Sequence, residues 1–117
     1  MSDRARHKAL KQAYRLTRPP MGLFVIRNLA TGRMFVDRSM NLTGSINRHR
    51  MELRRGVHRN VALMADWRRL GEAGFAFEVL EPLAERPEPG FDHARALDDR
   101  LAAWRATAPT GPDAPYN

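Results

Sequence analysis

The sequence predicts a small α+β domain in which helices cover a three-stranded antiparallel sheet. Three observations predict this fold. The chain has 117 residues, 43% of them hydrophobic, which is enough for one core and too few for two independent domains. Helical and strand-like hydrophobic periods follow one another in the order helix, β-hairpin, helix, helix, strand and helix. Asparagine and glycine stand where the central helices should begin and end.

The two predicted strands of the hairpin are short and apolar. Residues 21–26 are rich in β-branched and aromatic side chains, which favour strands. Residues 30–33 supply a turn that contains a glycine, and residues 34–36 form the returning strand. On this pattern alone, Phe24 and Phe35 are expected to be ordinary core side chains.

Two helices should follow the hairpin. The first is expected to begin at Asn41 and end at Gly56, and the second to begin at Asn60 and end at Gly71. Three apolar side chains and one histidine at helical spacing define the buried stripe of the first helix: Leu42, Ile46, His49 and Leu53. A histidine within such a stripe is expected to be packed and hydrogen-bonded.

A third strand is predicted over residues 75–80. Phe75, Phe77 and Val79 occupy alternate positions, so we expect these three side chains to face the core. The proline-containing residues 82–90 should form a loop, which is too short to be a linker between domains.

The two ends of the chain are predicted to differ. A last helix should begin near Asp92 and place three apolar side chains on one face: Leu97, Leu101 and Trp104. Residues 109–117 are proline-rich and expected to be extended. At the other end, residues 4–16 form an appended basic helix that two prolines stop. We therefore expect this helix within residues 1–20 and the folded domain over residues 21–117.

The charge of the chain is unevenly distributed. The formal net charge is +7, and the sequence pI is about 11.2. Residues 1–69 carry 16 basic and 4 acidic residues, whereas residues 70–117 carry 4 basic and 9 acidic ones. This asymmetry predicts an anionic partner for the first part, DNA or RNA. Of the 20 basic residues 18 are arginine, which either suits phosphate geometry or reflects the codon usage of a GC-rich genome.

Several classes of function are excluded by what the sequence lacks. No stretch is long enough to span a membrane, and the first twenty residues have no apolar signal-peptide region. The chain has no cysteine, so disulfides, thiolate zinc sites and cysteine nucleophiles are ruled out. It also has no glycine-rich phosphate loop and no His-x-x-x-His pair. We expect a soluble, cytoplasmic protein without a membrane partner.

Polar residues at the edge of an apolar helical stripe are candidates for lining a site. Ser45 lies about 60° from the centre of its stripe and is such a candidate, whereas Arg48 should be exposed. On the last helix, Asp98 lies about 60° from the stripe centre and Asp99 lies further toward solvent. Asp98 is therefore either a ligand for a divalent cation or a surface carboxylate that is solubilising or paired with an arginine. His58, in a short loop, could contact a phosphate, transfer a proton, or be solvated.

The strand and helix motifs resemble those of the GIY-YIG nuclease superfamily. The triplets G-L-F at 22–24 and F-V-D at 35–37, ten residues apart, resemble the two strand motifs that name the family. Over residues 41–81 the strings N-L-x3-I-N-R-H, E-L-R-R-G-x-H-x-N, L-x3-W-x3-G and F-x-F-E-V-L-E are similar to the rest of that domain. The closing P-Y-N at 115–117 resembles the ending G-Y-N. The resemblance covers roughly residues 21–117.

The resemblance implies an endonuclease that depends on Mg²⁺ or Mn²⁺ and has one active site on a face of the sheet. The two family tyrosines fall on Phe24 and Phe35, and the family arginine falls on Ser45. The metal-binding glutamate falls on Asp98, and a motif glycine falls on Asp37. The remaining positions match the family pattern: His49, His58 and Asn117.

These departures leave three functions open. Phenylalanine has no hydroxyl with which to position a water, and serine cannot stabilise phosphorane charge as a guanidinium does. The first hypothesis is a nucleic-acid-binding relative with weak or absent metal-dependent cleavage. Its expected nucleic-acid contacts are four arginines and the last residue: Arg48, Arg54, Arg55, Arg59 and Asn117.

The second hypothesis is an active endonuclease with a rearranged site. Asp37 and Asp98 would then hold the metal, and His49 or His58 would replace the tyrosine as base. Arg48 or Arg59 would replace the missing arginine. This requires the groups to converge within hydrogen-bond reach of one point. A third hypothesis is a scaffold reused for protein interaction or small-molecule chemistry.

Overall fold

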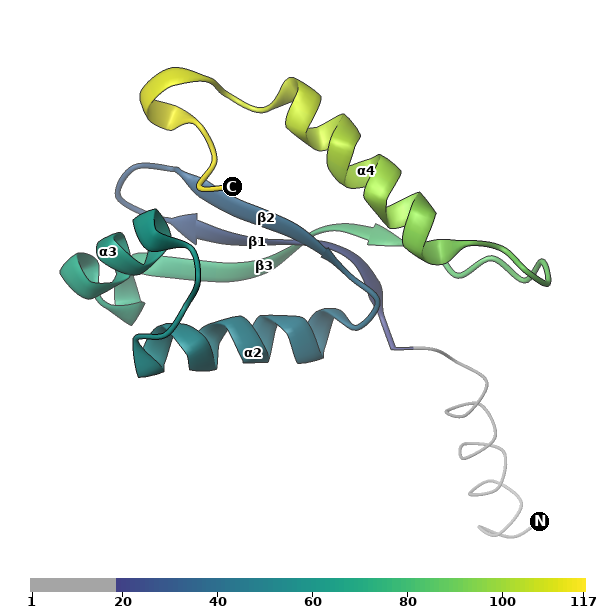
Figure 1. Cartoon of the computed structure of the whole chain (residues 1–117), viewed down its shortest axis with the longest axis horizontal. Helices are drawn as coiled ribbons and strands as arrows, with labels where there is room; N and C mark the ends of the chain where they lie inside the picture. The colour runs from purple at the N-terminus through teal and green to yellow at the C-terminus, as the bar shows by residue number, and fades with distance from the viewer. Residues whose placement is uncertain (1–18) are drawn as a thin grey trace, which may run out of the picture.

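The structure, a computed structural model, describes residues 19–117 (Figure 1). Three strands form one antiparallel sheet in the order β2-β1-β3: β1 (Met21–Asn28), β2 (Met34–Ser39) and β3 (Phe75–Leu83). Three helices pack on it: α2 (Leu42–Arg55), α3 (Val61–Leu70) and α4 (His93–Thr107). This confirms the predicted sheet and its three helices. The helix predicted over residues 4–16 lies outside the described residues.

The sheet has helices on both faces. Figure 1 shows α4 on one side of the strands and α2 with α3 on the other. In the central strand β1, Phe24 and Ile26 pack into the core beneath α2 and α3. Leu23 and Val25 pack with Leu101 of α4 on the opposite face. The strict alternation of a strand thus decides on which side each functional side chain of the hairpin lies.

Helix boundaries follow the sequence signals. The side chain of Asn41 accepts a hydrogen bond from the backbone N–H of Gly44 at the start of α2. Gly56 ends that helix in the left-handed region at φ 74°, which favours glycine. The side chain of Asn60 caps α3 in the same way, through the N–H of Leu63. The predicted caps are confirmed, and together they fix the short loop that carries His58.

The third strand departs from regular alternation at a β-bulge. Phe24 pairs with Val79, whereas Leu23 pairs with Glu81, so Leu80 is an extra residue. Leu80 lies on the same side as Glu78, which pairs with Val25, and packs against the core beneath α4; the bulge leaves Glu81 opposite Leu23, so that Glu81 lies on this side as well. Val79 was expected to face the core, yet it is 49% exposed. It lies on an edge strand whose outer part the helices leave uncovered.

The bulge also explains a glycine in β1. Gly22 has a φ of 151°, and a Cβ placed on it would lie 2.2 Å from the carbonyl oxygen of Glu81. Only glycine allows the two backbones to approach so closely. The strand β3 then continues through Pro82 to Leu83, so the loop predicted over residues 82–90 begins two residues later. Proline is accommodated there because β3 is an edge strand.

The outer edge of β2 is capped by the end of the chain. The backbone N–H of Tyr116 donates to the carbonyl oxygen of Met34 at 2.8 Å. The side chain of Asn117 both accepts from the N–H of Val36 and donates to its carbonyl, at 3.1 and 2.7 Å. The tail was predicted to be extended, but it contains a short 3₁₀ turn at Gly111–Asp113 and buries Tyr116. The contacts protect a strand edge that would otherwise invite pairing with another chain.

Candidate functional site

A pair of histidines forms the centre of the face beneath α2. His49 comes from the buried stripe of α2, and His58 comes from the loop between Gly56 and Asn60. The Nδ1 atom of His49 lies 2.8 Å from the Nε2 atom of His58. Both side chains are buried. His49 is packed and hydrogen-bonded as its pattern predicts, whereas the solvated alternative for His58 is wrong.

The hydrogen bonds around the pair assign its tautomers. The Nδ1 atom of His58 accepts a hydrogen bond from the backbone N–H of Asn60 at 3.1 Å, so it carries no proton in the neutral ring. The proton of His58 is therefore on Nε2 and is donated to Nδ1 of His49. His49 must then carry its own proton on Nε2. No described residue forms a hydrogen bond with this Nε2 atom. Every buried side-chain polar atom of the described residues has a hydrogen-bond partner, so an atom without one is not buried, and the Nε2–H of His49 reaches solvent.

The environment keeps both rings neutral. Burial is the largest cause that lowers the pKa of His49, from 6.5 to about 4, and the neighbouring His58 and Arg48 lower it further. Burial also lowers the pKa of His58, and Arg59 and Arg48 act in the same direction against Glu52. The two arginines are thus close enough for their charge to act on the pair. The solvent-facing edge of His49 is a neutral donor, and the charge of Arg48 acts on this ring against the smaller opposing effects of Glu52 and Asp37.

Two phenylalanine rings enclose the histidine pair. The ring centroid of His49 lies 5.1 Å from that of Phe24 and 5.2 Å from that of Phe35. Phe35 also meets His58 edge-on at 5.4 Å. Phe24 and Phe35 are buried, as their pattern predicts. The structure therefore brings together four of the candidate residues, and neither phenylalanine offers a hydroxyl to a bound ligand.

Ser45 has a local structural partner. Its hydroxyl is hydrogen-bonded to the hydroxyl of Ser39 at the end of β2. Ser39 in turn accepts the backbone N–H of Asn41, the residue that caps α2, at 2.9 Å. The half-buried Ser45 thus helps to fix the start of α2 against the sheet. It adds no positive charge to the histidine pair.

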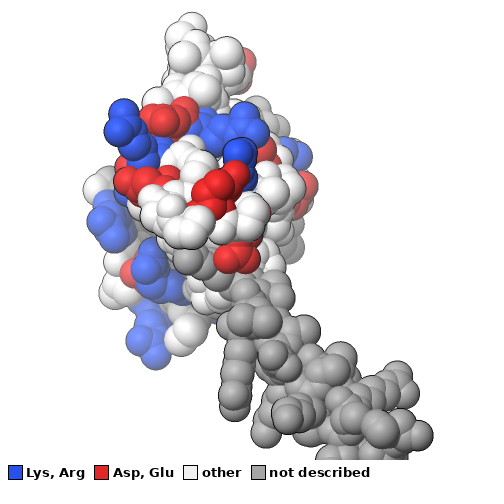
Figure 2. Space-filling model, turned by 90° about the vertical axis from the view of Figure 1, so that its right-hand side faces the viewer, with Lys and Arg blue, Asp and Glu red and all other residues white. Residues whose placement is uncertain are grey.

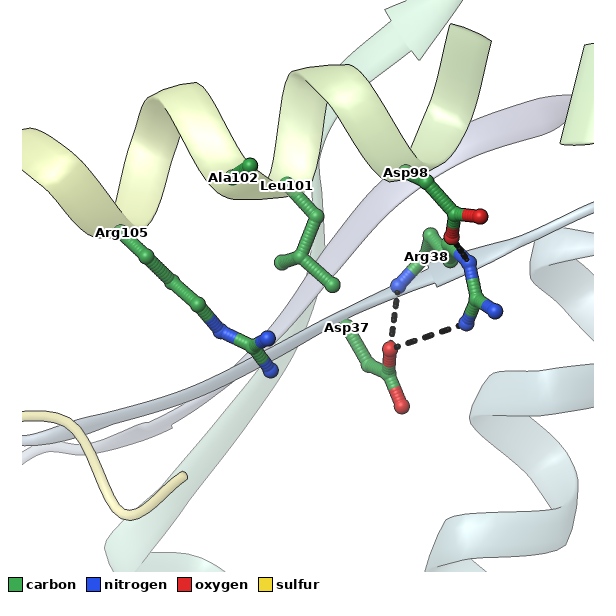
Figure 3. A pocket seen from close by; sticks show the side chains of 6 residues that line it. All are labelled: Asp37, Arg38, Asp98, Leu101, Ala102 and Arg105. Carbon is green, nitrogen blue, oxygen red and sulfur yellow. Dashed lines mark hydrogen bonds and ion pairs between the residues drawn. The ribbon is translucent and has the colours of Figure 1, made fainter. Parts of the chain in front are cut away.

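The two acidic candidates, Asp37 and Asp98, both line a pocket at the edge of β2. The residues that line an open pocket of about 520 Å³ come from β2 and α4: Asp37, Arg38, Asp98, Leu101, Ala102 and Arg105 (Figure 3). The Nε atom of Arg38 pairs with the carboxylate of Asp98. Asp98 projects from α4, which covers the face opposite α2. Asp98 is therefore an arginine-paired surface carboxylate, and the structure does not bring it to His49.

Asp37 lies between the histidine pair and the Arg38–Asp98 pair. It stands opposite Phe24 in the β1–β2 register, and its charge slightly opposes the lowering of the His49 pKa. Its Oδ1 atom, however, accepts the backbone N–H of Arg38 at 2.8 Å and lies 3.6 Å from a terminal nitrogen of the same arginine. The convergence of acids, histidine and guanidinium that a rearranged active site requires is not present in this arrangement.

The arginines of α2 and α3 differ in how much they are already engaged. Residues 42–70 hold seven arginines and two carboxylates. Arg54 forms a two-point pair with Glu72, with both distances 2.6 Å. Four exposed arginines of these two helices and their loop have no carboxylate partner in the described part of the chain: Arg48, Arg55, Arg59 and Arg68, of which Arg68 donates to the carbonyl oxygen of Gly56. Figure 2, by contrast, shows basic and acidic side chains interleaved at the height of α4.

Some residues with important contacts carried no clear sequence signal. The side chain of Asn28 is fully buried and donates to the hydroxyl of Tyr116 at 3.0 Å, and that hydroxyl donates to Asp66 at 2.6 Å. The sequence also carried no direct sign that Arg38 pairs with Asp98. Its position two residues after Val36 could have indicated that its side chain lies on the α4 side. Asn117, expected to contact nucleic acid, uses its side chain to bind Val36.

One group of side chains has metal-like spacing. Single ligand atoms of His49, Glu52 and His58 lie within 4.8 Å of one another. A metal at Nε2 of His58 would move the ring proton to Nδ1, which faces the N–H donor of Asn60. Metal-binding histidines instead donate their second N–H to an acceptor. In the arrangement seen, the group therefore suits a hydrogen-bonded pair and does not fit a metal ion.

Comparison with known proteins identifies the fold. The structure is similar to that of a mutant catalytic domain of the intron endonuclease I-TevI, with a TM-score of 0.61, 18% identity, and coverage of 74% of this chain and 81% of that chain. A second structure of the catalytic domain of this homing endonuclease gives a TM-score of 0.59, 19% identity, and coverage of 74% and 85%. No family model and no curated protein sequence matches the chain. The described part has the GIY-YIG nuclease fold, which the sequence resemblance predicts. No helix in the described part is long and apolar enough to cross a membrane.

Proposed function

We propose that this chain, with its GIY-YIG nuclease fold, binds the phosphate backbone of DNA or RNA and has weak or absent cleavage activity. One observation carries the proposal. The Nε2–H of His49 faces solvent, the charge of Arg48 acts on His49, and the charges of Arg59 and Arg48 act on His58 beside it. A neutral N–H donor with exposed guanidinium groups nearby suits a phosphate oxygen.

The charge on the surrounding surface supports the same partner. Arg48, Arg55 and Arg59 are exposed and have no carboxylate partner among residues 19–117. Phosphate contacts of this kind release counterions, so they contribute affinity without reading sequence. We therefore propose binding with little sequence preference.

The residues at the catalytic positions argue for weak chemistry. Phe24 and Phe35 stand where the resembling family has tyrosines, so no hydroxyl reaches a nucleophilic water. Ser45 stands at the arginine position and is bonded to Ser39. Loss of a guanidinium that stabilises a phosphoryl transition state typically costs roughly a factor of 10³ or more. Slow or absent hydrolysis is the consequence.

The arrangement also bears on the proton chemistry of His49. Its Nδ1 accepts from His58, so Nε2 holds the proton and has no lone pair to act as a general base. A swap of tautomers would place a proton on Nδ1 of His58, against the N–H donor of Asn60. His49 is therefore proposed to donate to a phosphate oxygen rather than to deprotonate water.

A salt titration of binding tests the proposal. We would measure fluorescence anisotropy of a short labelled duplex with the full chain, in the presence of a chelator. The logarithm of affinity should fall linearly with the logarithm of salt concentration. In the Arg48→Ala/Arg59→Ala variant, binding should weaken about tenfold or more, and the slope should fall by about two. Arg95→Ala, an exposed arginine on α4, is the matched control and should change little.

The second candidate, an active endonuclease, is favoured by the retention of both histidines at the family positions. Plasmid nicking with Mg²⁺ or Mn²⁺ separates it from the first. The proposal expects slow nicking at most, or none above a chelated control. Rapid metal-dependent nicking that His49→Gln abolishes would establish the second candidate instead. Binding that does not respond to salt, or no binding at low salt, would refute the first.

A further inference from the structure

The pocket at the edge of β2 contains two carboxylates that share one guanidinium. Figure 3 shows Arg38 between Asp37 and Asp98. Its Nε atom pairs with Asp98, and its terminal nitrogen lies 3.6 Å from Asp37. The backbone N–H of Arg38 donates to the same oxygen of Asp37 at 2.8 Å. One arginine thus contacts both acids that could have held a cation.

We propose that the guanidinium of Arg38 takes the place of a divalent cation between Asp37 and Asp98. The protein then carries its own positive charge where the fold family implies a metal. The donor set does not fit Mg²⁺ or Mn²⁺ in this arrangement, because Arg38 binds one oxygen of each carboxylate and places its own positive charge between the two acids, where an ion bridging them would lie.

The strand geometry holds Arg38 in this position. In β2, Val36 packs toward Leu101 of α4, and strand alternation directs the side chain two residues later to the same side. Asp98 lies on α4 one helical turn before Leu101, so it faces that arginine. The pairing therefore follows from how α4 docks on the sheet and does not depend on a flexible loop.

The charge of the whole pocket opposes a divalent ion. Two carboxylates are balanced by two guanidinium groups, those of Arg38 and Arg105, which also lines the pocket (Figure 3). No carboxylate among the described residues pairs with Arg105. A divalent cation at Asp98 would displace Arg38 and then remain close to both guanidinium groups, which repel it.

Titration with Mn²⁺ tests the inference without nucleic acid. Free Mn²⁺ would be measured by electron paramagnetic resonance with the full chain. The unaltered protein should show no saturable site that depends on Asp98. Arg38→Met should create such a site, with an increase in affinity of at least about tenfold. Arg38→Met/Asp98→Asn should lose it again.

A second arginine pair on α4 supplies the control. Arg100 pairs with Glu81 at 2.8 Å, and both are on the surface. Arg100→Met removes the same charge from an equivalent pair and should create no Mn²⁺ site. Each variant should fold, because all the altered side chains are on the surface. A cooperative thermal melting transition of each variant checks this.

Two results would overturn the inference. One is saturable Mn²⁺ binding by the unaltered protein that Asp98→Asn abolishes. The other is a folded Arg38→Met variant that gains no affinity. The Mn²⁺ titration contains no nucleic acid, so a result against this inference leaves the proposed nucleic-acid binding untouched. The binding assay contains a chelator, so an absence of nucleic-acid binding leaves this inference untouched.

Discussion

The Nδ1 atom of His49 accepts a hydrogen bond from the Nε2 atom of His58 at 2.8 Å, and a backbone amide decides this direction. The amide is that of Asn60, which donates to the other nitrogen of His58. A cap residue of α3 thus determines which nitrogen of a ring on α2 is protonated. The relation depends on the loop between the two helices being held at both ends, by Gly56 and Asn60.

We expect the protein to lose stability as the pH falls from about 6.5 to about 4. The pKa of His49 is about 4 in the folded protein and 6.5 in the unfolded chain. Between these two pH values the unfolded chain binds more protons than the folded protein. The free energy of unfolding therefore decreases as the pH is lowered, by roughly 3 kcal/mol at most. Urea unfolding at several pH values measures it. His49→Gln should flatten the dependence; an unchanged slope in that variant would contradict the assignment.

Gly22→Ala should destabilise the protein by roughly 3 kcal/mol or more. The added Cβ would lie 2.2 Å from the carbonyl oxygen of Glu81, and the φ of 151° is itself strained for alanine. Gly32→Ala is the control, because Gly32 also has a positive φ but has nothing within 4 Å of its Cβ position. It should cost only about 1 kcal/mol. Equal losses in the two variants would show that the bulge does not impose the glycine.

Tyr116→Phe should cost roughly 1–3 kcal/mol of folding free energy. The hydroxyl links Asn28 and Asp66, and its removal leaves the buried amide of Asn28 without its nearer partner. The same hydroxyl is the largest cause that lowers the pKa of Asp66, so that pKa should rise in the variant. Chemical unfolding and NMR titration measure the two effects. In a double-mutant cycle, Tyr116→Phe and Asp66→Asn should be non-additive; additive losses would mean that the two groups are not coupled.

Arg54→Ala should weaken nucleic-acid binding less than Arg48→Ala or Arg59→Ala. The guanidinium of Arg54 is already held by both oxygens of Glu72, and this pairing is the main cause that lowers the pKa of that glutamate. An exposed pair of this kind contributes little to stability, so the melting temperature should change little. Anisotropy at a fixed salt concentration compares the three variants. A loss for Arg54→Ala as large as for Arg59→Ala would show that the pair opens on binding.

Several features follow from the sequence because they depend on neighbours along the chain. The caps at Asn41 and Asn60 are local hydrogen bonds to the next turn, and the helix end at Gly56 is a local backbone conformation. Burial of Phe24 and exposure of Arg48 follow from periods of two and about 3.6 residues, which fix the face on which a side chain lies. The residue spacing also carried enough information to indicate the nuclease fold.

The partners of the polar groups were decided only by the tertiary structure. Periodicity places Asp98 at the edge of its helix stripe, but the docking of α4 on β2 determines that it meets Arg38, which lies sixty positions earlier in the chain. The bulge at Leu80 depends in the same way on the pairing of β1 with β3. Local spacing fixes the direction of a side chain relative to its own element; what it meets depends on strand register and helix docking, which many distant contacts set together.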